Sequence, residues 1–497
     1  MTKKILTLLF SVIILITPTY GQLSKTITVT TPGTLESQLG TDKAKVTDLV
    51  LTGTINSADF TTIKQMTLLK VLDMSNVDII DGKIPASAFA NRNMTKLILP
   101  IKLKIIGDNA FDRMSVFSLD FSACLDLEEL GNKVFSGFKS SIGILDFSKN
   151  KSLTRFLKEG QNRWGTFTGC GEHVILPTNM TILPVCIFYG FKGSVDLPLT
   201  LEDISYNSFT NSNLTKGLIL PASLKRVQNN AFSGMTIPSL DFSACINLEE
   251  LGEQSFNGFK SNLGILDFSK NKSLTRFLKE GLNRWGTFTG CGEHVILPTN
   301  MTVLPPCTFY GFKGSVDLPQ TIETISFSSF SNSVLTKGLI LPASLKKVED
   351  NAFSGVSAPS LNFLASINLE ELGNNIFNGF KSNLGILDFS TNKSLTRFLR
   401  EGMGRWGTFT NCNQHVILPV NLTAIPSCSF YGFKGSVTFS PVLETIGESA
   451  FANSVLTKGI VFPNSLKTIG TKAFYNSTIP SVSFEQMDPG QSGVSCF

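Results

Sequence analysis

The chain has 497 residues, of which 42% are hydrophobic and 16% are charged, and its formal net charge at pH 7 is +5. This composition excludes an intrinsically disordered chain, which would have fewer apolar residues and a higher net charge. The 43 Lys and Arg residues are scattered along the sequence without a basic run. The sequence therefore shows no basic cluster of the kind by which proteins bind nucleic acid.

Residues 1–21 have the order of a secretory signal peptide. Lys3 and Lys4 precede an apolar run from Ile5 to Ile16, and small and polar residues follow up to Gly21. The apolar run is too short to span a bilayer, and no other segment is long and apolar enough to do so. We therefore expect an exported protein, secreted or at the cell surface, with no membrane span.

A block of 121 residues occurs three times in the chain. Arg163-Trp164-Gly165, for example, returns at positions 284–286 and again at 405–407. Repetition at a fixed period indicates an array of stacked units instead of one globular core.

The repeats divide the chain into four parts. We expect a signal peptide (1–21), an N-terminal cap with the first degenerate repeats (22–90), a solenoid (91–485) and a tail (486–497). The solenoid consists of three blocks of five coils, and the third block is partly degraded.

Each block contains five short strands of the pattern apolar-x-apolar. In the first block they are 97–99, 119–121, 145–147, 174–176 and 195–197. Units of roughly 20 to 29 residues that open with a short strand are typical of leucine-rich repeats. Because side chains alternate along a strand, Leu97 and Leu99 point inward and Ile98 faces out. We therefore expect an α/β repeat fold, a leucine-rich repeat solenoid with a parallel β-sheet along one face and short helical or irregular segments on the other.

Two further features recur within the coils. Three residues after the second inward position stands a small polar residue or a cysteine, namely Cys124, Asn150, Asn179, Thr200 and Ser223. We expect this side chain to bond to the backbone of the neighbouring coil and so to satisfy buried amides. The second half of many coils reads like Ile106 to Phe111, where the Phe supplies a large apolar side chain to the core.

The unit "IGxxAF" followed by a strand "xLxLP" resembles the BspA-like leucine-rich repeat family of bacterial surface proteins. The stretch from Thr34 to Ser75 resembles the N-terminal cap of such proteins from Bacteroidetes. The resemblance covers nearly all of the mature chain. It implies a secreted or surface-exposed protein, and several members of the family are adhesins for host proteins or other bacteria. The motif specifies the scaffold and not the ligand.

The outward residues of the strands form a candidate ligand-binding surface, which we call the outward stripe. In the first two blocks it contains Asp120, Asp146, Ile175, Asp196, Asp241, Asp267, Ile296 and Asp317. Alternating carboxylates and exposed isoleucines give a mixed surface of the kind that protein interfaces use. The alternative is a solvated sheet face whose identity between blocks records duplication alone. In the third block Asn362 and Thr438 replace two of the aspartates, so we expect ligand contact to be strongest in the first two blocks.

The sequence contains no recognisable catalytic or metal centre. Asp120 and Asp146 stand on neighbouring strands, but two carboxylates do not supply the six or more oxygens that Ca²⁺ takes. His173 and its equivalents in the other blocks are the only histidines, and the register places His173 near Asp146 with no nucleophile beside it. We therefore expect no metal, no cofactor and no enzyme activity.

Trp164, Trp285 and Trp406 are the only tryptophans, and each follows an arginine in the longest coil. They are a second candidate for ligand contact, because an arginine–tryptophan pair can stack on a glycan or on a partner side chain. The alternative, which we favour, is that Trp164 packs near Phe156 and Phe167 over the extra residues of this coil.

Six of the nine cysteines recur in pairs that are 16 residues apart. The pairs are Cys170 with Cys186, Cys291 with Cys307, and Cys412 with Cys428. An exported chain permits disulfides, and one that closes a loop of this size adds about 3 kcal/mol of stability. In BspA-like repeats, however, the cysteine at the end of "FTGC" is often a buried thiol, so both states stay open.

The sequence thus favours a non-catalytic, adhesin-like binding protein that recognises a protein or glycan on a host or a neighbouring cell. The competing interpretation is an envelope or periplasmic scaffold for protein–protein assembly. Neither interpretation involves nucleic acid, and the oligomeric state stays open.

Overall fold

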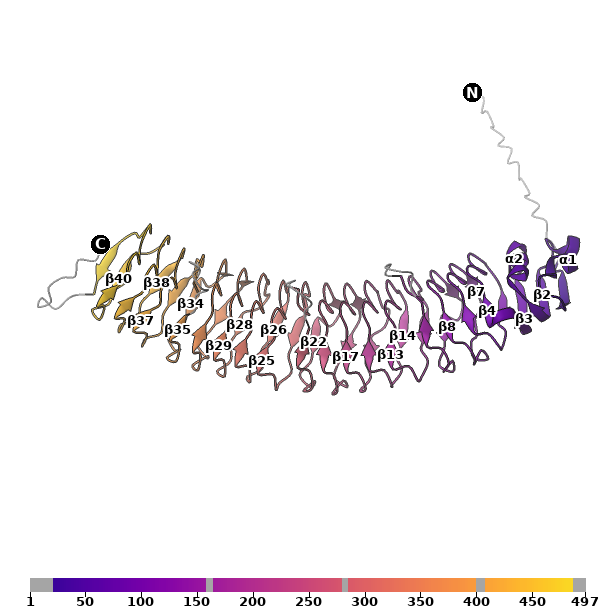
Figure 1. Ribbon diagram of the computed structural model, residues 1–497, viewed down its shortest axis with the longest axis horizontal. Helices are drawn as coiled ribbons and strands as arrows, with labels where there is room; N and C mark the ends of the chain where they lie inside the picture. The colour runs from indigo at the N-terminus through magenta and orange to yellow at the C-terminus, as the bar shows by residue number, and fades with distance from the viewer. Residues whose placement is uncertain (1–20, 158–163, 279–284, 399–406, 486–497) are drawn as a thin grey trace, which may run out of the picture.

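The computed structural model describes residues 21–157, 164–278, 285–398 and 407–485. The predicted signal peptide up to residue 20 and the predicted tail lie outside these ranges. The described residues wind into one long, curved solenoid, with the N-terminal coils (indigo) at one end and the C-terminal coils (yellow) at the other (Figure 1). The predicted leucine-rich repeat solenoid is confirmed.

The strands of the pattern apolar-x-apolar stack in a parallel row, which we call the first sheet. Neighbouring strands pair in register, for example β10 with β12 and β12 with β14. The row contains β1 (Ser24–Val29), β2 (Asp48–Ile55), β3 (Val71–Ile79), β5 (Lys96–Ile98), β10 (Ile144–Asp146), β12 (His173–Ile175), β14 (Ser194–Asp196), β16 (Leu218–Ile219), β19 (Leu240–Asp241), β22 (Ile265–Asp267), β24 (His294–Ile296), β26 (Ser315–Asp317), β28 (Leu339–Ile340), β31 (Leu361–Asn362), β34 (Ile386–Asp388), β36 (His415–Ile417), β38 (Ser436–Thr438), β40 (Ile460–Phe462) and β42 (Val482–Phe484). The segment 119–121 occupies the same place in its coil without forming a strand.

A second parallel row of two-residue strands follows later in each coil, and we call it the second sheet. It contains β4 (Lys83–Ile84), β6 (Ile105–Ile106), β8 (Glu129–Leu130), β11 (Arg155–Phe156), β13 (Ile182–Leu183), β15 (Asp203–Ile204), β17 (Arg226–Val227), β20 (Glu250–Leu251), β23 (Arg276–Phe277), β25 (Val303–Leu304), β27 (Thr324–Ile325), β29 (Lys347–Val348), β32 (Glu371–Leu372), β35 (Arg397–Phe398), β37 (Ala424–Ile425), β39 (Thr445–Ile446) and β41 (Thr468–Ile469).

Shorter pairs of strands close the coil before the chain re-enters the first sheet. They are β7 (Ser115–Val116) with β9 (Lys139–Ser140), β18 (Thr236–Ile237) with β21 (Lys260–Ser261), and β30 (Ser357–Ala358) with β33 (Lys381–Ser382).

The helices of the described residues lie in the first coils. They are α1 (Leu35–Leu39), η1 (Gly40–Asp42), α2 (Ser57–Gln65) and η2 (Ile80–Gly82). The buried carboxylate of Asp59 accepts hydrogen bonds from the backbone N–H groups of Gly33 (2.7 Å), Leu35 (3.0 Å) and Asn56 (2.9 Å). It therefore joins the starts of both α-helices. No helix among the described residues is long and apolar enough to cross a bilayer.

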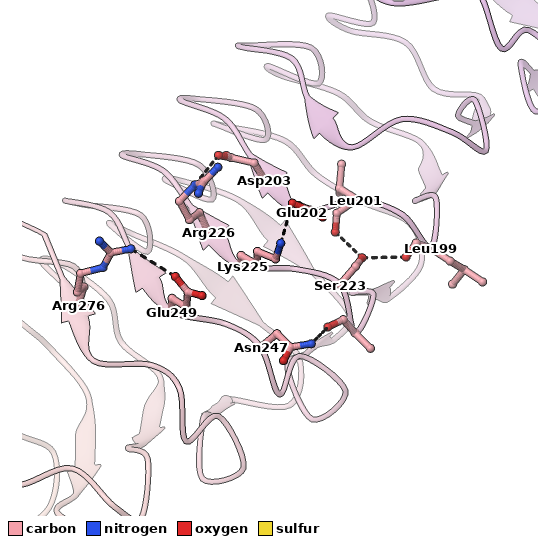
Figure 2. A network of polar contacts seen from close by, with 11 residues as sticks. Leu199, Leu201, Glu202, Asp203, Ser223, Lys225, Arg226, Asn247, Glu249 and Arg276 are labelled. Carbon is pink, nitrogen blue, oxygen red and sulfur yellow. Dashed lines mark hydrogen bonds and ion pairs between the residues drawn. The ribbon is translucent and has the colours of Figure 1, made fainter.

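The expected alternation of inward and outward side chains is confirmed. Leu97 and Leu99 are buried and Ile98 is half-buried, and Ile106 of the second sheet is buried opposite them. The recurring polar position also behaves as predicted, since it bonds to the backbone of the preceding coil. The Ser223 hydroxyl donates to the carbonyls of Leu199 (2.8 Å) and Leu201 (2.7 Å), as Figure 2 shows.

A continuous column of phenylalanine rings runs through the core from Phe89 to Phe474. Each coil contributes one ring, and successive ring centroids are 4.5 to 6.3 Å apart. The rings are those of Phe89, Phe111, Phe135, Phe167, Phe188, Phe209, Phe232, Phe256, Phe288, Phe309, Phe330, Phe353, Phe377, Phe409, Phe430, Phe451 and Phe474. Large buried rings in contact supply both apolar area and the preference of aromatic pairs for offset stacking.

The turn around each phenylalanine explains why the motif is so regular. In the turn of Phe232, Asn230 (φ +56°) and Gly234 (φ +64°) adopt left-handed backbone conformations, which Asn and Gly tolerate best. This geometry aims backbone N–H groups at the next coil, where Phe232 donates to Ser255 (2.9 Å) and Gly234 donates to Asn257 (2.7 Å). The turns therefore form a hydrogen-bonded ladder that holds the rings in register.

We expect Phe256→Ala to lower the local unfolding free energy by about 3–5 kcal/mol, because it leaves a cavity in the middle of the column. Hydrogen exchange resolved by residue should show faster exchange in the coils around 250–290, since stability in an array is local. Phe117→Ala is the matched control, because Phe117 is exposed and its loss should cost under about 0.5 kcal/mol. Equal effects of the two substitutions would contradict the role of the column.

We expect Ser366→Cys to raise stability by about 1 kcal/mol. In the first two blocks the same position holds Cys124 and Cys245, whose thiols donate to the carbonyls of Pro100 and Pro221 at 3.4 Å. The buried hydroxyl of Ser366 has no hydrogen-bond partner among the described residues, which is costly for a polar group. Thermal unfolding is the measurement, and a lower Tm for Ser366→Cys would contradict this account.

Candidate ligand-binding face

The first sheet assembles the outward stripe. The register places Asp146 beside Ile175 and Ile175 beside Asp196. The second block repeats this arrangement with Asp267, Ile296 and Asp317. Between these strands, Ile219 of β16 pairs with Asp241 of β19. The stripe therefore alternates acidic and apolar side chains on neighbouring strands.

The apolar members of the stripe differ in exposure. Ile219 and Ile340 are 83% and 66% exposed, whereas Ile175 and Ile296 are half-buried. An isoleucine that exposed on a sheet face contributes little to the fold, because it removes almost no apolar area from water. The two positions are available to a ligand.

Most aspartates of the stripe also have a local structural role. One oxygen of Asp120 accepts a hydrogen bond from the backbone N–H of Ser122 (2.7 Å), and Asp146 accepts one from Ser148 (2.8 Å). Asp241 and Asp267 repeat the contact with Ser243 and Ser269. These carboxylates therefore cap the turn that follows the strand. No group of three or more His, Cys, Asp or Glu residues that could hold a metal ion occurs within the described ranges.

Asp196 and Asp317 have a partner that the sequence did not predict, namely the histidine of the preceding coil. The Nε2 atom of His173 lies 3.1 Å from Asp196 on the following coil. The Nδ1 atom of His173 lies 2.7 Å from the Ser194 hydroxyl, which turns the ring toward the following strand.

The contact between His173, Ser194 and Asp196 combines the residue types of a hydrolytic triad, and its second copy is formed by His294, Ser315 and Asp317. Ser194, however, is only 5% exposed, so its hydroxyl has no access to a substrate. A nucleophile must reach the atom it attacks. We therefore assign these residues the role of joining neighbouring strands.

The third block changes this contact. Thr438 replaces the aspartate, and its hydroxyl lies 3.2 Å from Nε2 of His415. Burial, together with the nearby charge of Lys458, lowers the pKa of His415 below its ordinary value of 6.5. A base whose folded pKa is lowered stabilises the fold above its ordinary pKa and loses that contribution as the pH falls through the folded value.

The tryptophans are partly exposed and have other partners than those predicted. The indole of Trp164 is 42% exposed and lies edge-on against Tyr189 of the next coil, with ring centroids 5.7 Å apart. The Lys133 ammonium lies 4.9 Å from the centre of the indole. The expected neighbour Phe167 instead belongs to the buried column. Trp285 repeats the contact with Tyr310, and Trp406 lies outside the described residues.

Of the two states left open for the cysteine pairs, the structure has the buried thiol. Cys170, Cys291 and Cys412 are buried and form no disulfide. The two members of a pair stand at opposite ends of stacked turns. The Cys170 carbonyl accepts from the N–H of Lys192 at the end of the next turn, whereas Cys186 opens that turn and lies over Gly165. Burial raises the pKa of Cys170 to about 12.

The second sheet carries a ladder of ion pairs that sequence reasoning missed. Asp203, Arg226, Glu250 and Arg276 stand opposite one another on successive strands. Arg226 contacts Asp203 at 2.9 Å and Arg276 contacts Glu250 at 3.1 Å. Figure 2 shows the first pair, and it shows Arg276 with its other partner, Glu249, at 3.6 Å. The hydrogen bond to Asp203 raises the pKa of Arg226. The sequence does contain a pattern that could have predicted these ion pairs: acidic and basic residues alternate from coil to coil at the position before the inward residue. This pattern becomes visible only when the sequences of the coils are aligned.

We expect Thr438→Asp to raise the pKa of His415, because the new carboxylate would favour the charged imidazole. Titration of the imidazole by NMR measures this shift in a chain with only three histidines. Thr438→Ser is the control, since it keeps the hydroxyl and adds no charge. A His415 pKa that stays the same in Thr438→Asp would contradict the contact.

We expect the buried thiols of Cys124, Cys170, Cys245, Cys291 and Cys412 to resist alkylation in the native protein at pH 8. Burial raises the pKa of each to about 12, and the thiolate is the reactive species. Peptide mass spectrometry after treatment with iodoacetamide should find these thiols modified only in denaturant. Rapid native labelling of Cys170 would contradict its burial.

A family model described as the BspA-type leucine-rich repeat region matches residues 82–158, 165–279, 286–399 and 406–496, in six copies. No curated protein sequence matches the chain.

Several solved structures are similar in part. A leucine-rich repeat protein from Bacteroides ovatus is 15% identical, with 79% of each chain covered and a TM-score of 0.31. One from Eubacterium ventriosum is 18% identical over 64% of this chain and 85% of that chain, with a TM-score of 0.29. A leucine-rich cell surface protein from Faecalibacterium prausnitzii is 14% identical over 83% and 86%, with a TM-score of 0.24. The assignment therefore rests on the family model, which matches well over half of the residues, and the chain belongs to the BspA-type leucine-rich repeat family.

Proposed function

We propose that the protein is a non-catalytic binding protein, secreted or at the cell surface, that holds a protein or glycan ligand on the outward stripe of its first sheet. The observation that carries the proposal is the exposure of Ile219 in the middle of the sheet. It is 83% exposed, and carboxylates stand on both neighbouring coils, at Asp196 and Asp241.

The side chains of the outward stripe fit a ligand that carries both apolar groups and hydrogen-bond donors. Apolar groups on the ligand that cover Ile219 and, five strands further along, Ile340 would remove from water two of the most exposed aliphatic side chains among the described residues. The aspartates each keep an oxygen for donors on the ligand, because the local cap uses the other one. Apolar contact flanked by hydrogen-bonding groups is the usual anatomy of a protein interface.

The family supports the location outside the cytoplasm and the absence of catalysis, since BspA-like proteins with known roles bind at cell surfaces. The predicted signal peptide points the same way. Surface proteolysis of intact cells tests the location. Cleavage of the protein favours surface exposure, whereas protection until the envelope is opened favours the periplasmic scaffold.

We expect the double variant Ile219→Asp/Ile340→Asp to weaken binding by at least about tenfold, which equals about 1.4 kcal/mol. The purified chain is first screened against an array of extracellular matrix proteins and mucin glycans, and the Kd for each ligand found is then measured. The matched control is Ile182→Asp/Val303→Asp, which places the same charges at exposed apolar positions of the second sheet.

The control variant should bind like the original chain. Loss of binding in the control with retention in Ile219→Asp/Ile340→Asp would move the ligand to the second sheet. An array without any binding above background would remove the main support of the proposal.

A further inference from the structure

A row of lysines lies along the edge where each coil passes from the phenylalanine turn back to the first sheet. Each block contributes three of them, and we call the set the lysine edge. It consists of Lys139, Lys192, Lys216, Lys260, Lys313, Lys337, Lys381, Lys434 and Lys458. All nine are exposed.

The backbone ladder between coils sets the spacing of these lysines. Lys139 of β9 pairs in register with Ser115 of β7, and the N–H of Lys192 donates to the Cys170 carbonyl of the preceding coil (2.8 Å). Lys216 lies further along its coil, closer to the first sheet, because Asn213 occupies the position that pairs with Thr236. Three lysines occur in every five coils. At about 4.8 Å per coil, the edge carries one positive charge about every 8 Å on average.

The charge of the edge is not balanced locally. None of the nine lysines forms an ion pair with another described residue, whereas Lys225 and Lys346 of the second sheet pair with glutamates at 3.0 Å. The carboxylates on the same stretch of the coil are those of Glu172 and Glu293, which are buried. Glu172 accepts hydrogen bonds from the backbone N–H and the hydroxyl of Ser140 and so serves the fold.

The electrostatic effect of the edge is visible at one neighbour. The charge of Lys458 contributes to the lowered pKa of His415 at the border of the first sheet. The lysines are spaced by roughly one Debye length at physiological salt, so a ligand with charges along its own length meets each of them almost independently.

We propose that the lysine edge binds a linear anionic polysaccharide, of the sulfated class. The inference rests on the proposed function, because the protein must be outside the cytoplasm to meet such a glycan, and it names a second ligand surface beside the outward stripe. A linear polyanion matches a long row of cations that recur every one or two coils along the solenoid. Exposed polar side chains such as Asn213 and Thr236 stand between Lys192 and Lys260 and can bond hydroxyl groups.

Two features of the edge favour a polysaccharide over single-stranded nucleic acid. Proteins that bind single strands stack the bases on aromatic side chains. Among the described residues, the stretches that carry the lysine edge hold neither Trp nor Tyr, and most of their Phe rings are buried, as with Phe138, Phe259 and Phe380. Trp164 and Tyr189 lie on the turn, outside these stretches.

The test uses the full mature chain and heparin immobilised on a biosensor, at 0.15 M salt. We expect saturable binding that weakens as salt rises, and a loss of at least about fivefold in affinity for the triple variant Lys192→Gln/Lys313→Gln/Lys434→Gln. The matched control is Lys225→Gln/Lys346→Gln/Lys467→Gln, which removes the same charge at the same 121-residue spacing from paired lysines. The control should change the Kd by less than about twofold. Circular dichroism verifies that both variants fold.

Three results would overturn the inference. They are the absence of heparin binding, equal loss in the two triple variants, and binding of single-stranded DNA as tightly as heparin. The double variant Ile219→Asp/Ile340→Asp should keep full heparin binding. If the chain does not bind heparin but still binds an array ligand on the outward stripe, only this inference is overturned. If it binds neither heparin nor an array ligand, the proposed function is overturned as well.

Discussion

The phenylalanine column is the constraint on which the rest of the structure depends. Its rings stand at nearly constant separation although the coils differ in length, because every coil places one phenylalanine in the same turn. A left-handed residue follows that phenylalanine in every turn, and in most turns another one precedes it, while Gly165, Gly286 and Gly407 depart from this in the longest coils. The turns bond to one another through their backbones. The sheets on either side of the column therefore stay in register.

This regularity sorts side chains into long rows, each with its own chemistry. The second sheet carries opposite charges on neighbouring strands, and these pairs neutralise one another across the register. The outward stripe carries aspartates with exposed isoleucines, and the lysine edge carries cations without local counter-charges. Rows that are balanced within the molecule serve the fold, since surface pairs are each worth at most about 1 kcal/mol. Rows whose charges have no partner within the molecule are the ones that can bind an oppositely charged ligand.

Much of the scaffold could be predicted from the sequence because each coil repeats a local rule. The alternation of apolar residues along the strand predicted that Leu97 and Leu99 point inward. The position of Ser223 after its strand predicted that its side chain bonds to the backbone of a neighbouring coil. The failures concern contacts that depend on direction or on distant residues. The partner of His173 depends on a ring rotation set by Ser194, and a separation of 16 residues does not reveal that Cys170 and Cys186 stand at opposite ends of stacked turns.

The lysine edge was hidden for a related reason. Its members lie 24 to 53 residues apart in the chain, so no basic run marks them, and only the stacking of coils brings them into one row. The ion pairs of the second sheet were hidden in the same way. The outward stripe could be found in advance, because its residues belong to the strands that reveal the repeat.

The central proposal is that ligand binding takes place on the first sheet. Hydrogen–deuterium exchange with and without a ligand identified on the array tests this most directly. We expect slower exchange in the first-sheet segments around Asp196, Ile219 and Asp241, with little change in the second sheet. Slower exchange confined to the strands around Arg226 and Glu250 would contradict the proposal.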